Sequence, residues 1–167
     1  MKAECMRIGA ARLCLAMILA LLVVPGYVVA PVLFAKAGSA SLAGMLAGEI
    51  FHVANISILL LAVALVFFWK RMQGKHTKTN RWRWLLLFVV AALVAANEFV
   101  LSSIMADLKL QMGPIEDVAR DDPQRRLFGM WHGLSAILHL LATIISVLLV
   151  ALGARTASAE PVSGGAF

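Results

Sequence analysis

Three histidines within long apolar runs are the first residues of this chain that could do chemistry. The stretch FGMWHGLSAILHL, residues 128–140, carries His132 and His139 seven residues apart, which places them on one face of a helix. His52 lies in a second apolar run. Imidazole can ligate a metal ion or carry a proton near neutral pH. Because an ionisable side chain is costly in hydrocarbon, each of these histidines needs a partner or a function.

Other polar side chains accompany the histidines. Glu49 and Asn55 lie three residues before and after His52, roughly on the same helix face. Asn97 and Glu98 interrupt another apolar run, and Ser135 follows His132 by three residues. These types can complete a metal site, relay a proton or hold a small solute.

The elements that must position these residues are predicted to be membrane helices. The chain has 167 residues, of which 62% are hydrophobic and 14% charged, whereas soluble domains carry about 25% charged residues. Four apolar runs, one of them interrupted by Glu98, each supply the roughly 20 residues that cross a bilayer. They predict spans at about 10–34, 47–69, 83–106 and 127–152. One soluble core could not bury so large an apolar excess.

The basic residues predict the orientation of the spans. Of the 15 Lys and Arg residues, ten lie on one predicted side: three near the N-terminus, six in the linker KRMQGKHTKTNRWR and one in the C-terminal tail. The positive-inside rule therefore predicts cytoplasmic termini. Trp69, Trp82 and Trp84 flank the linker and Trp131 begins the fourth span, as expected for headgroup-level rings. The net charge of +6 thus reflects topology, and we expect no nucleic-acid binding.

Capping signals predict where the helices begin and end. Asp122 and Pro123 form an N-cap followed by a proline at the first helical position, which predicts a helix from Pro123 to Leu152. The second helix is predicted to begin near Ser41 and to end at Gly74, a C-terminal glycine. Proline and glycine at residues 25, 26 and 31 predict a kink in the first span.

The chain is predicted to form a single four-span domain over residues 1–154, with a disordered cytoplasmic tail at 155–167. The 23 uncharged residues after Arg12 exceed the roughly 7–15 of a signal-peptide core, so we expect the first span to be retained.

Two GxxxG pairs predict helix contacts. Gly44 with Gly48 precedes His52, and Gly129 with Gly133 surrounds His132. Glycines at this spacing let two backbones approach closely. We therefore expect the second and fourth spans to pack together near the level of these two histidines.

The residues leave three roles open for the histidine pair. His52 and His132 could share a packing hydrogen bond, ligate a metal or haem together with Glu49 or Glu98, or handle a proton or solute. Glu98 is expected to be a neutral acid hydrogen-bonded to His132 or Asn97, or a direct participant in function. His139 lies about 10 Å deeper than His132, so the two could not share one metal ion.

The chain resembles a known membrane family at these residues. APVLF (residues 30–34), IFH (50–52), the AAN ending at Asn97 and FGMWHGLS (128–135) are similar to segments of the family of transmembrane protein 205, also grouped as domain of unknown function 4149. The resemblance spans roughly Leu13 to Leu152. It implies a four-span membrane protein without an established chemistry, and it marks as shared positions His52, Asn97, His132, Gly133 and Ser135.

Together these observations predict an all-α integral membrane protein with four transmembrane helices in an antiparallel N-in/C-in bundle, in a bacterial cytoplasmic membrane. The candidate polar cluster lies in the outer leaflet and comprises His52, Glu49, Asn97, Glu98, His132 and Ser135. The leading hypothesis is a non-enzymatic protein that, without a cofactor, binds or passes a small solute through this cluster or supports a membrane-protein partner or a second copy. The alternatives are a haem- or metal-binding redox protein with His52 and His132 as ligands, and a purely structural accessory subunit. No nucleophile is paired with a base at a recognisable spacing, so enzyme activity is not expected.

Overall fold

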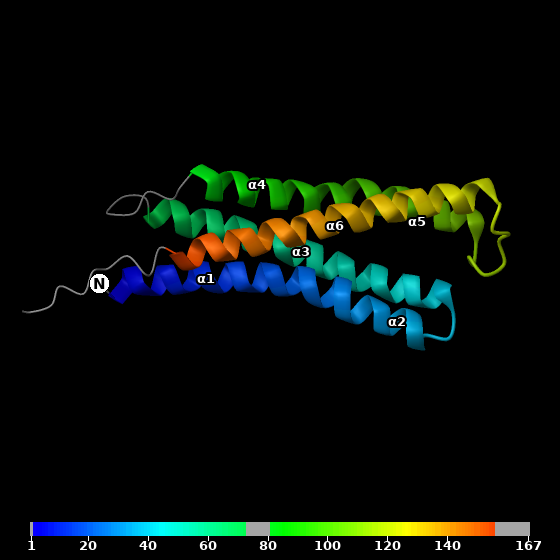
Figure 1. Ribbon diagram of the computed structural model, residues 1–167, viewed down its shortest axis with the longest axis horizontal. Helices are drawn as coiled ribbons and strands as arrows, with labels where there is room; N and C mark the ends of the chain where they lie inside the picture. The colour runs from blue at the N-terminus through cyan, green and yellow to red at the C-terminus, as the bar shows by residue number, and fades with distance from the viewer. Residues whose placement is uncertain (1, 73–80, 156–167) are drawn as a thin grey trace, which may run out of the picture.

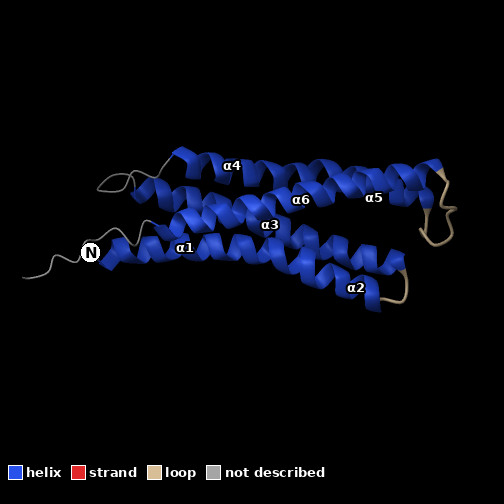
Figure 2. Cartoon of the chain, viewed as in Figure 1, coloured by secondary structure: helices blue, strands red, loops and turns tan. Residues whose placement is uncertain are grey.

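The computed structural model describes residues 2–72 and 81–155, and within them every regular element is a helix (Figures 1 and 2). In chain order these are α1 (Lys2–Val23), η1 (Val24–Val29), α2 (Ala30–Lys36), α3 (Ala40–Met72), α4 (Arg81–Ala96), η2 (Asn97–Leu101), α5 (Ser102–Met112) and α6 (Pro123–Arg155). The elements η1 and η2 are π-helical turns that connect α1 to α2 and α4 to α5.

Four continuous helical segments are long and apolar enough to cross a membrane, which makes this a multi-pass integral membrane protein. They are Cys5–Lys36, Ala40–Met72, Arg81–Met112 and Pro123–Leu152, and each contains one predicted span. At 30 to 33 residues they are about 45–50 Å long, against a hydrocarbon core of about 30 Å. Gly74 and residues 156–167 of the predicted tail lie outside the described residues.

Successive segments run back and forth along the long axis (Figure 1). The first packs on α3 and on α6, and α4 likewise packs on both, whereas α3 and α6 share no extensive packing among the described residues. Thus α3 and α6 lie on a diagonal. The expectation that the second and fourth spans pack together is wrong for this arrangement.

The GxxxG glycines do not mediate close helix contacts here. A Cβ atom added at Gly48, Gly129 or Gly133 would meet nothing within 4 Å, and one at Gly44 would meet only the Lys109 ammonium, at 4.0 Å. The reason is that aliphatic side chains on other faces offer far more contact surface than glycine does, and dispersion contacts scale with atom number.

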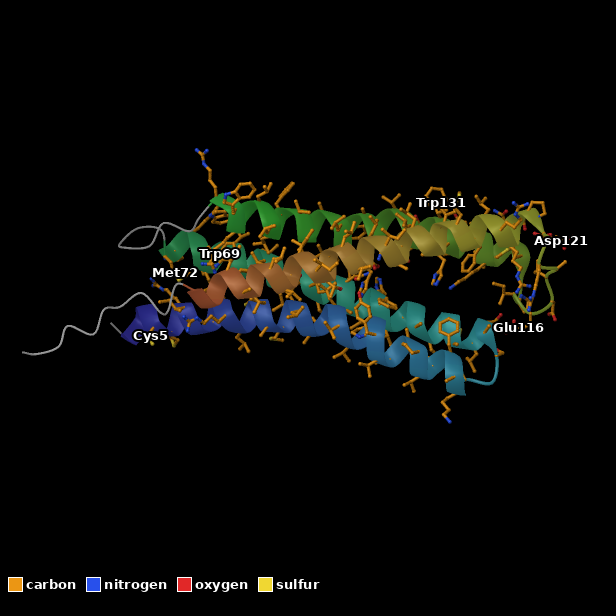
Figure 3. All side chains as sticks on the ribbon, viewed as in Figure 1. Cys5, Trp69, Met72, Glu116, Asp121 and Trp131 are labelled. Atoms are coloured by element: carbon orange, nitrogen blue, oxygen red, sulfur yellow. The ribbon has the colours of Figure 1, made fainter. Side chains whose placement is uncertain are left out.

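The apolar core occupies the half of the bundle that contains the N-terminus. Its buried members are Ala11, Cys14, Leu15, Ile18, Leu22, Ile58, Ala62, Leu65, Trp69, Leu87, Val90, Val94, Ala142 and Leu149. Trp69 is 1% exposed, edge-on to Trp84 at 5.2 Å between ring centroids and beneath the Arg83 guanidinium at 4.9 Å. Trp69 and Trp131 lie toward opposite ends of the molecule (Figure 3).

The other half separates into two helix pairs. There α2 packs on η1 and α3, while α5 packs on η2 and α6. No residue of α2 is buried. The core is therefore continuous at one end only, and the level where it stops is where polar side chains begin.

Both π turns change the backbone hydrogen-bond register from four residues to five. The Ala30 N–H donates to the Pro25 carbonyl, and the Ser102 N–H donates to the Asn97 carbonyl. At η1 the cause is Pro25, which has no N–H for the Leu21 carbonyl one turn earlier. This break fulfils the kink predicted for the first span, and π turns frequently mark functional sites.

His139 contacts the backbone of the first segment beside this break. Its Nε2 lies 2.9 Å from the Leu22 carbonyl oxygen, so this nitrogen carries the proton and donates it. The imidazole ring also meets Phe51 edge-on, with 5.2 Å between ring centroids. Gly26 makes room for it, because a Cβ there would lie 2.5 Å from Nε2. His139 therefore donates a hydrogen bond from α6 to a backbone carbonyl of the first segment.

The connection between α5 and α6 confirms the predicted cap. The Asp122 carboxylate accepts the N–H groups of Gln124 at 2.8 Å and Arg125 at 3.2 Å, and α6 begins at Pro123. The same loop contacts the start of α3, since Glu116 accepts hydrogen bonds from the N–H of Ser41, at 2.8 Å, and from its hydroxyl. These bonds lower the pKa of the Glu116 carboxyl from 4.5 to about 2.

We expect Gly26→Ala to lower the free energy of unfolding by about 1–3 kcal/mol, the usual cost of an overpacked site. The added methyl group would drive His139 from the Leu22 carbonyl. Gly48→Ala is the matched control, because it adds the same group to open space and should change stability by less than about 0.5 kcal/mol. Unfolding in detergent measures both, and equal effects would contradict this assignment.

The Glu116 contact predicts an acid-sensitive connection. Because folding lowers the pKa of Glu116 from 4.5 to about 2, its stabilising effect is complete above 4.5 and is lost as pH falls toward about 2. The protection factor for amide hydrogen exchange at Ile115, whose N–H donates to the Ser41 hydroxyl, should fall over that range. In Ser41→Ala the carboxyl should titrate nearer its ordinary pKa, and an unchanged titration would refute the assignment.

Candidate functional site

A buried carboxyl at the first turn of η2 organises the polar layer. The Glu98 side chain is 6% exposed. Its Oε1 contacts Nδ1 of His52, and its Oε2 accepts a hydrogen bond from the Asn55 amide at 2.9 Å. Both partners come from α3, where residues 52 and 55 lie on one face. The expected partners of Glu98, His132 and Asn97, are therefore wrong: the acid is held by α3.

His52 connects this buried acid to the surroundings. Its side chain is 59% exposed, although its Nδ1 is bound to Glu98. When Glu98 is ionised, Nδ1 carries a proton and donates it, so the lone pair of neutral His52 lies on the outward Nε2. A carboxylate on Nδ1 fixes the tautomer and the orientation of the imidazole ring.

The same π turn also contacts α6. Asn97 is buried, and its Oδ1 accepts a hydrogen bond from the Ser135 hydroxyl at 2.6 Å. Asn97 and Glu98 thus point to different helices from adjacent positions. Together with the bond from His139 to Leu22, this layer links all four membrane-spanning segments by polar contacts.

The remaining predicted residues lie apart from this network. Glu49 is exposed and makes no contact with Glu98. His132 is exposed, and its ring stacks on Phe128 of its own helix at 6.0 Å between centroids. The structure brings together His52, Asn97, Glu98 and Ser135 around η2, and it does not join His132 or Glu49 to them.

The described residues contain no cluster of side chains that could hold a shared metal ion. No group of three or more His, Cys, Asp or Glu side chains gathers there closely enough to hold an ion. His52 contacts Glu98, whereas His132 contacts Phe128. The outward Nε2 of His52, with a carboxylate on Nδ1, nevertheless has the geometry common to metal-binding histidines.

Sequence reasoning missed two functional positions. The sequence indicates Asn55 only as a neighbour of His52, yet it is 4% exposed and donates the second hydrogen bond to Glu98. Gly26 was assigned only to a kink, whereas it makes the space for His139. The i, i+3 spacing signalled the first, but no sequence pattern indicates that the fourth span would approach Gly26.

The fold and site define a multi-pass membrane protein with a polar layer across its helices. Residues 13–114, more than half of the chain, match the family described as domain of unknown function (DUF4149), and the chain belongs to that family. The match contains His52, Asn55, Asn97 and Glu98 and ends before α6. No curated protein and no solved structure matches the chain.

We expect Glu98→Ala to lower the free energy of unfolding by about 1–3 kcal/mol, because it leaves the buried Asn55 amide without its acceptor. Glu49→Ala, which removes an exposed carboxylate from the same region, should change stability by less than about 0.5 kcal/mol. Unfolding by SDS in mixed micelles compares the two. If the two losses were alike, the buried acid would have no special structural role.

Proposed function

We propose that this protein binds a small polar solute, coupled to a proton, at the pair formed by His52 and Glu98. The observation that carries this proposal is the exposure difference within the pair: a carboxyl that is 6% exposed holds an imidazole that is 59% exposed. A pair that served only packing would be expected to bury both members. Here Glu98 contacts Nδ1 of His52, while most of the imidazole surface stays exposed.

The pair favours a solute with an acidic or hydrogen-bond-donating group. Both oxygens of Glu98 already have partners, so the solute would meet the outward nitrogen of His52 first. If the solute gave up a proton to Nε2, Glu98 would stabilise the resulting imidazolium.

We further propose that the helices form an antiparallel N-in/C-in bundle in a bacterial cytoplasmic membrane. The basic residues near the N-terminus and around the linker at 70–83 support this orientation through the positive-inside rule. Glu98 follows Trp84 by 14 residues, about 21 Å along the helix. In a hydrocarbon core of about 30 Å, that depth places the pair in the outer third. The segments APVLF, IFH and FGMWHGLS support kinship with transmembrane protein 205.

A metal- or haem-binding function is the second candidate. It is favoured by the contact of Glu98 with Nδ1 of His52, which leaves Nε2 as the nitrogen that could bind a metal. The metal or haem would be held by His52 together with His132 or with a ligand from a partner. The absorption spectrum and metal content of the purified protein separate it from solute binding. Stoichiometric metal or a Soret band that disappears in a His52→Ala/His132→Ala variant would establish this second function.

The solute proposal predicts a binding signal that depends on His52. We would measure thermal stabilisation of the detergent-solubilised protein by small carboxylic acids, phenols and amines from pH 5 to 8. A solute at about 100 times its Kd should stabilise the protein by about 2.7 kcal/mol. The effect should vanish in His52→Gln and Glu98→Gln and persist in His132→Gln, which alters an exposed histidine without contact to Glu98.

Other results would overturn this function. A solute that stabilises all variants alike binds elsewhere. A colourless, metal-free protein that no solute stabilises would favour an accessory subunit whose polar layer only fixes helix packing.

A further inference from the structure

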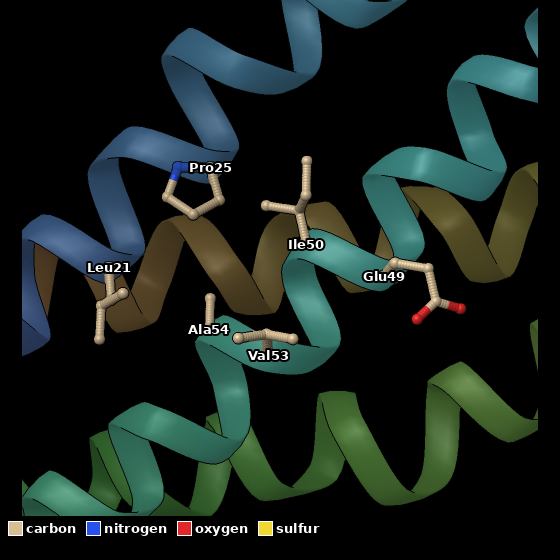
Figure 4. A pocket seen from close by; sticks show the side chains of 6 residues that line it. All are labelled: Leu21, Pro25, Glu49, Ile50, Val53 and Ala54. Carbon is tan, nitrogen blue, oxygen red and sulfur yellow. The ribbon is translucent and has the colours of Figure 1, made fainter.

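A groove between the first membrane-spanning segment and α3 shares no side chain with the pair of His52 and Glu98. It is lined by Leu21 and Pro25 from the first membrane-spanning segment and by Glu49, Ile50, Val53 and Ala54 from α3 (Figure 4). Its volume is about 370 Å³, within the range of about 300–1,000 Å³ typical of ligand pockets. The groove is open to the outside of the bundle, where a membrane protein meets lipid.

The groove is apolar along its length and has one charged residue at its end. Its only charged lining residue is Glu49, and its other five lining residues are apolar. Val53 and Ala54 follow Glu49 by about one turn, toward the apolar core half of the bundle. In Figure 4 the Glu49 carboxyl lies at one end of the groove and points away from Leu21. The acid therefore lies at the mouth of an apolar groove.

The position of Glu49 matches a bilayer surface. It precedes Trp69 by 20 residues, a separation of about 30 Å along a helix, which equals the thickness of a typical hydrocarbon core. With the Trp69 and Trp84 end at one interface, Glu49 lies at the other. The apolar floor then extends inward from that interface, as an acyl chain does.

The charge of Glu49 determines which kind of lipid headgroup the groove would favour. Among the described residues no Lys, Arg or His nitrogen lies within 4.0 Å of its carboxylate, the one such pair there being His52 with Glu98. An exposed acid without a cation attracts an ammonium group and repels an anionic phosphate ester that lacks one.

We propose that this groove binds a phospholipid with an amine-bearing headgroup. One acyl chain lies along Leu21, Pro25, Ile50, Val53 and Ala54, and the headgroup ammonium contacts Glu49. The site is independent of the function proposed for His52 and Glu98, because it uses none of the same side chains.

Spin-labelled lipids test this site. The protein would be reconstituted in phosphatidylcholine vesicles, and the motionally restricted fraction of spin-labelled phosphatidylethanolamine would be compared with that of spin-labelled phosphatidylglycerol. We expect a preference for the amine headgroup of about fivefold, the change that one charge near a membrane surface makes to association. Glu49→Gln should abolish this preference. Asp107→Asn, the same change at an exposed acid on α5, should leave it intact.

A second variant tests the groove itself. Val53→Trp fills the floor and should reduce the restricted lipid for both headgroups, while Glu49→Gln, being confined to an exposed side chain, keeps the fold. Equal preference in the wild type and Glu49→Gln would overturn the proposal, as would a preference for phosphatidylglycerol. Crosslinking between cysteines placed at position 53 of two chains would also overturn it, because a second copy would then occupy the groove.

Discussion

The whole arrangement depends on one constraint: inside a membrane, each polar group must find its partner within the protein. Pro25 and the π turn disturb the backbone of the first segment, and His139 from the fourth segment supplies a donor to the Leu22 carbonyl. Glu98 imposes the same demand, and α3 meets it with His52 and Asn55. These satisfied groups fix the relative positions of all four segments more specifically than apolar contacts could.

The two halves of the bundle consequently have different characters. One half is closed by aliphatic side chains around Trp69 and contains few polar groups in its interior. The other separates into the pairs α2 with α3 and α5 with α6, joined near the loop by the contact between Ser41 and Glu116. The polar layer lies at the transition between the two. A closely packed half thus adjoins a half whose helix pairs are separated.

Much of the architecture follows from local patterns. Four apolar runs of sufficient length predict four spanning helices because hydrocarbon permits little else, and Asp122 with Pro123 predicts the start of α6 because both act on the backbone of their own turn. The importance of His52, Asn97, Glu98 and Ser135 could also be predicted, since polar residues in apolar runs are costly. Their pairing could not be predicted: several partners were equally near in depth, and the choice among them depends on which helices are neighbours.

By itself, the sequence determined the class of protein, the number of spans, the kink near Pro25 and the set of polar residues that need partners. Each of these depends on composition or on interactions within one or two helical turns. Only the tertiary structure decided that α3 and α6 lie on a diagonal, which separates His52 from His132 and leaves Gly48, Gly129 and Gly133 without close neighbours. Helix order around a bundle results from the sum of many weak contacts across all faces, and no single motif such as GxxxG determines that sum.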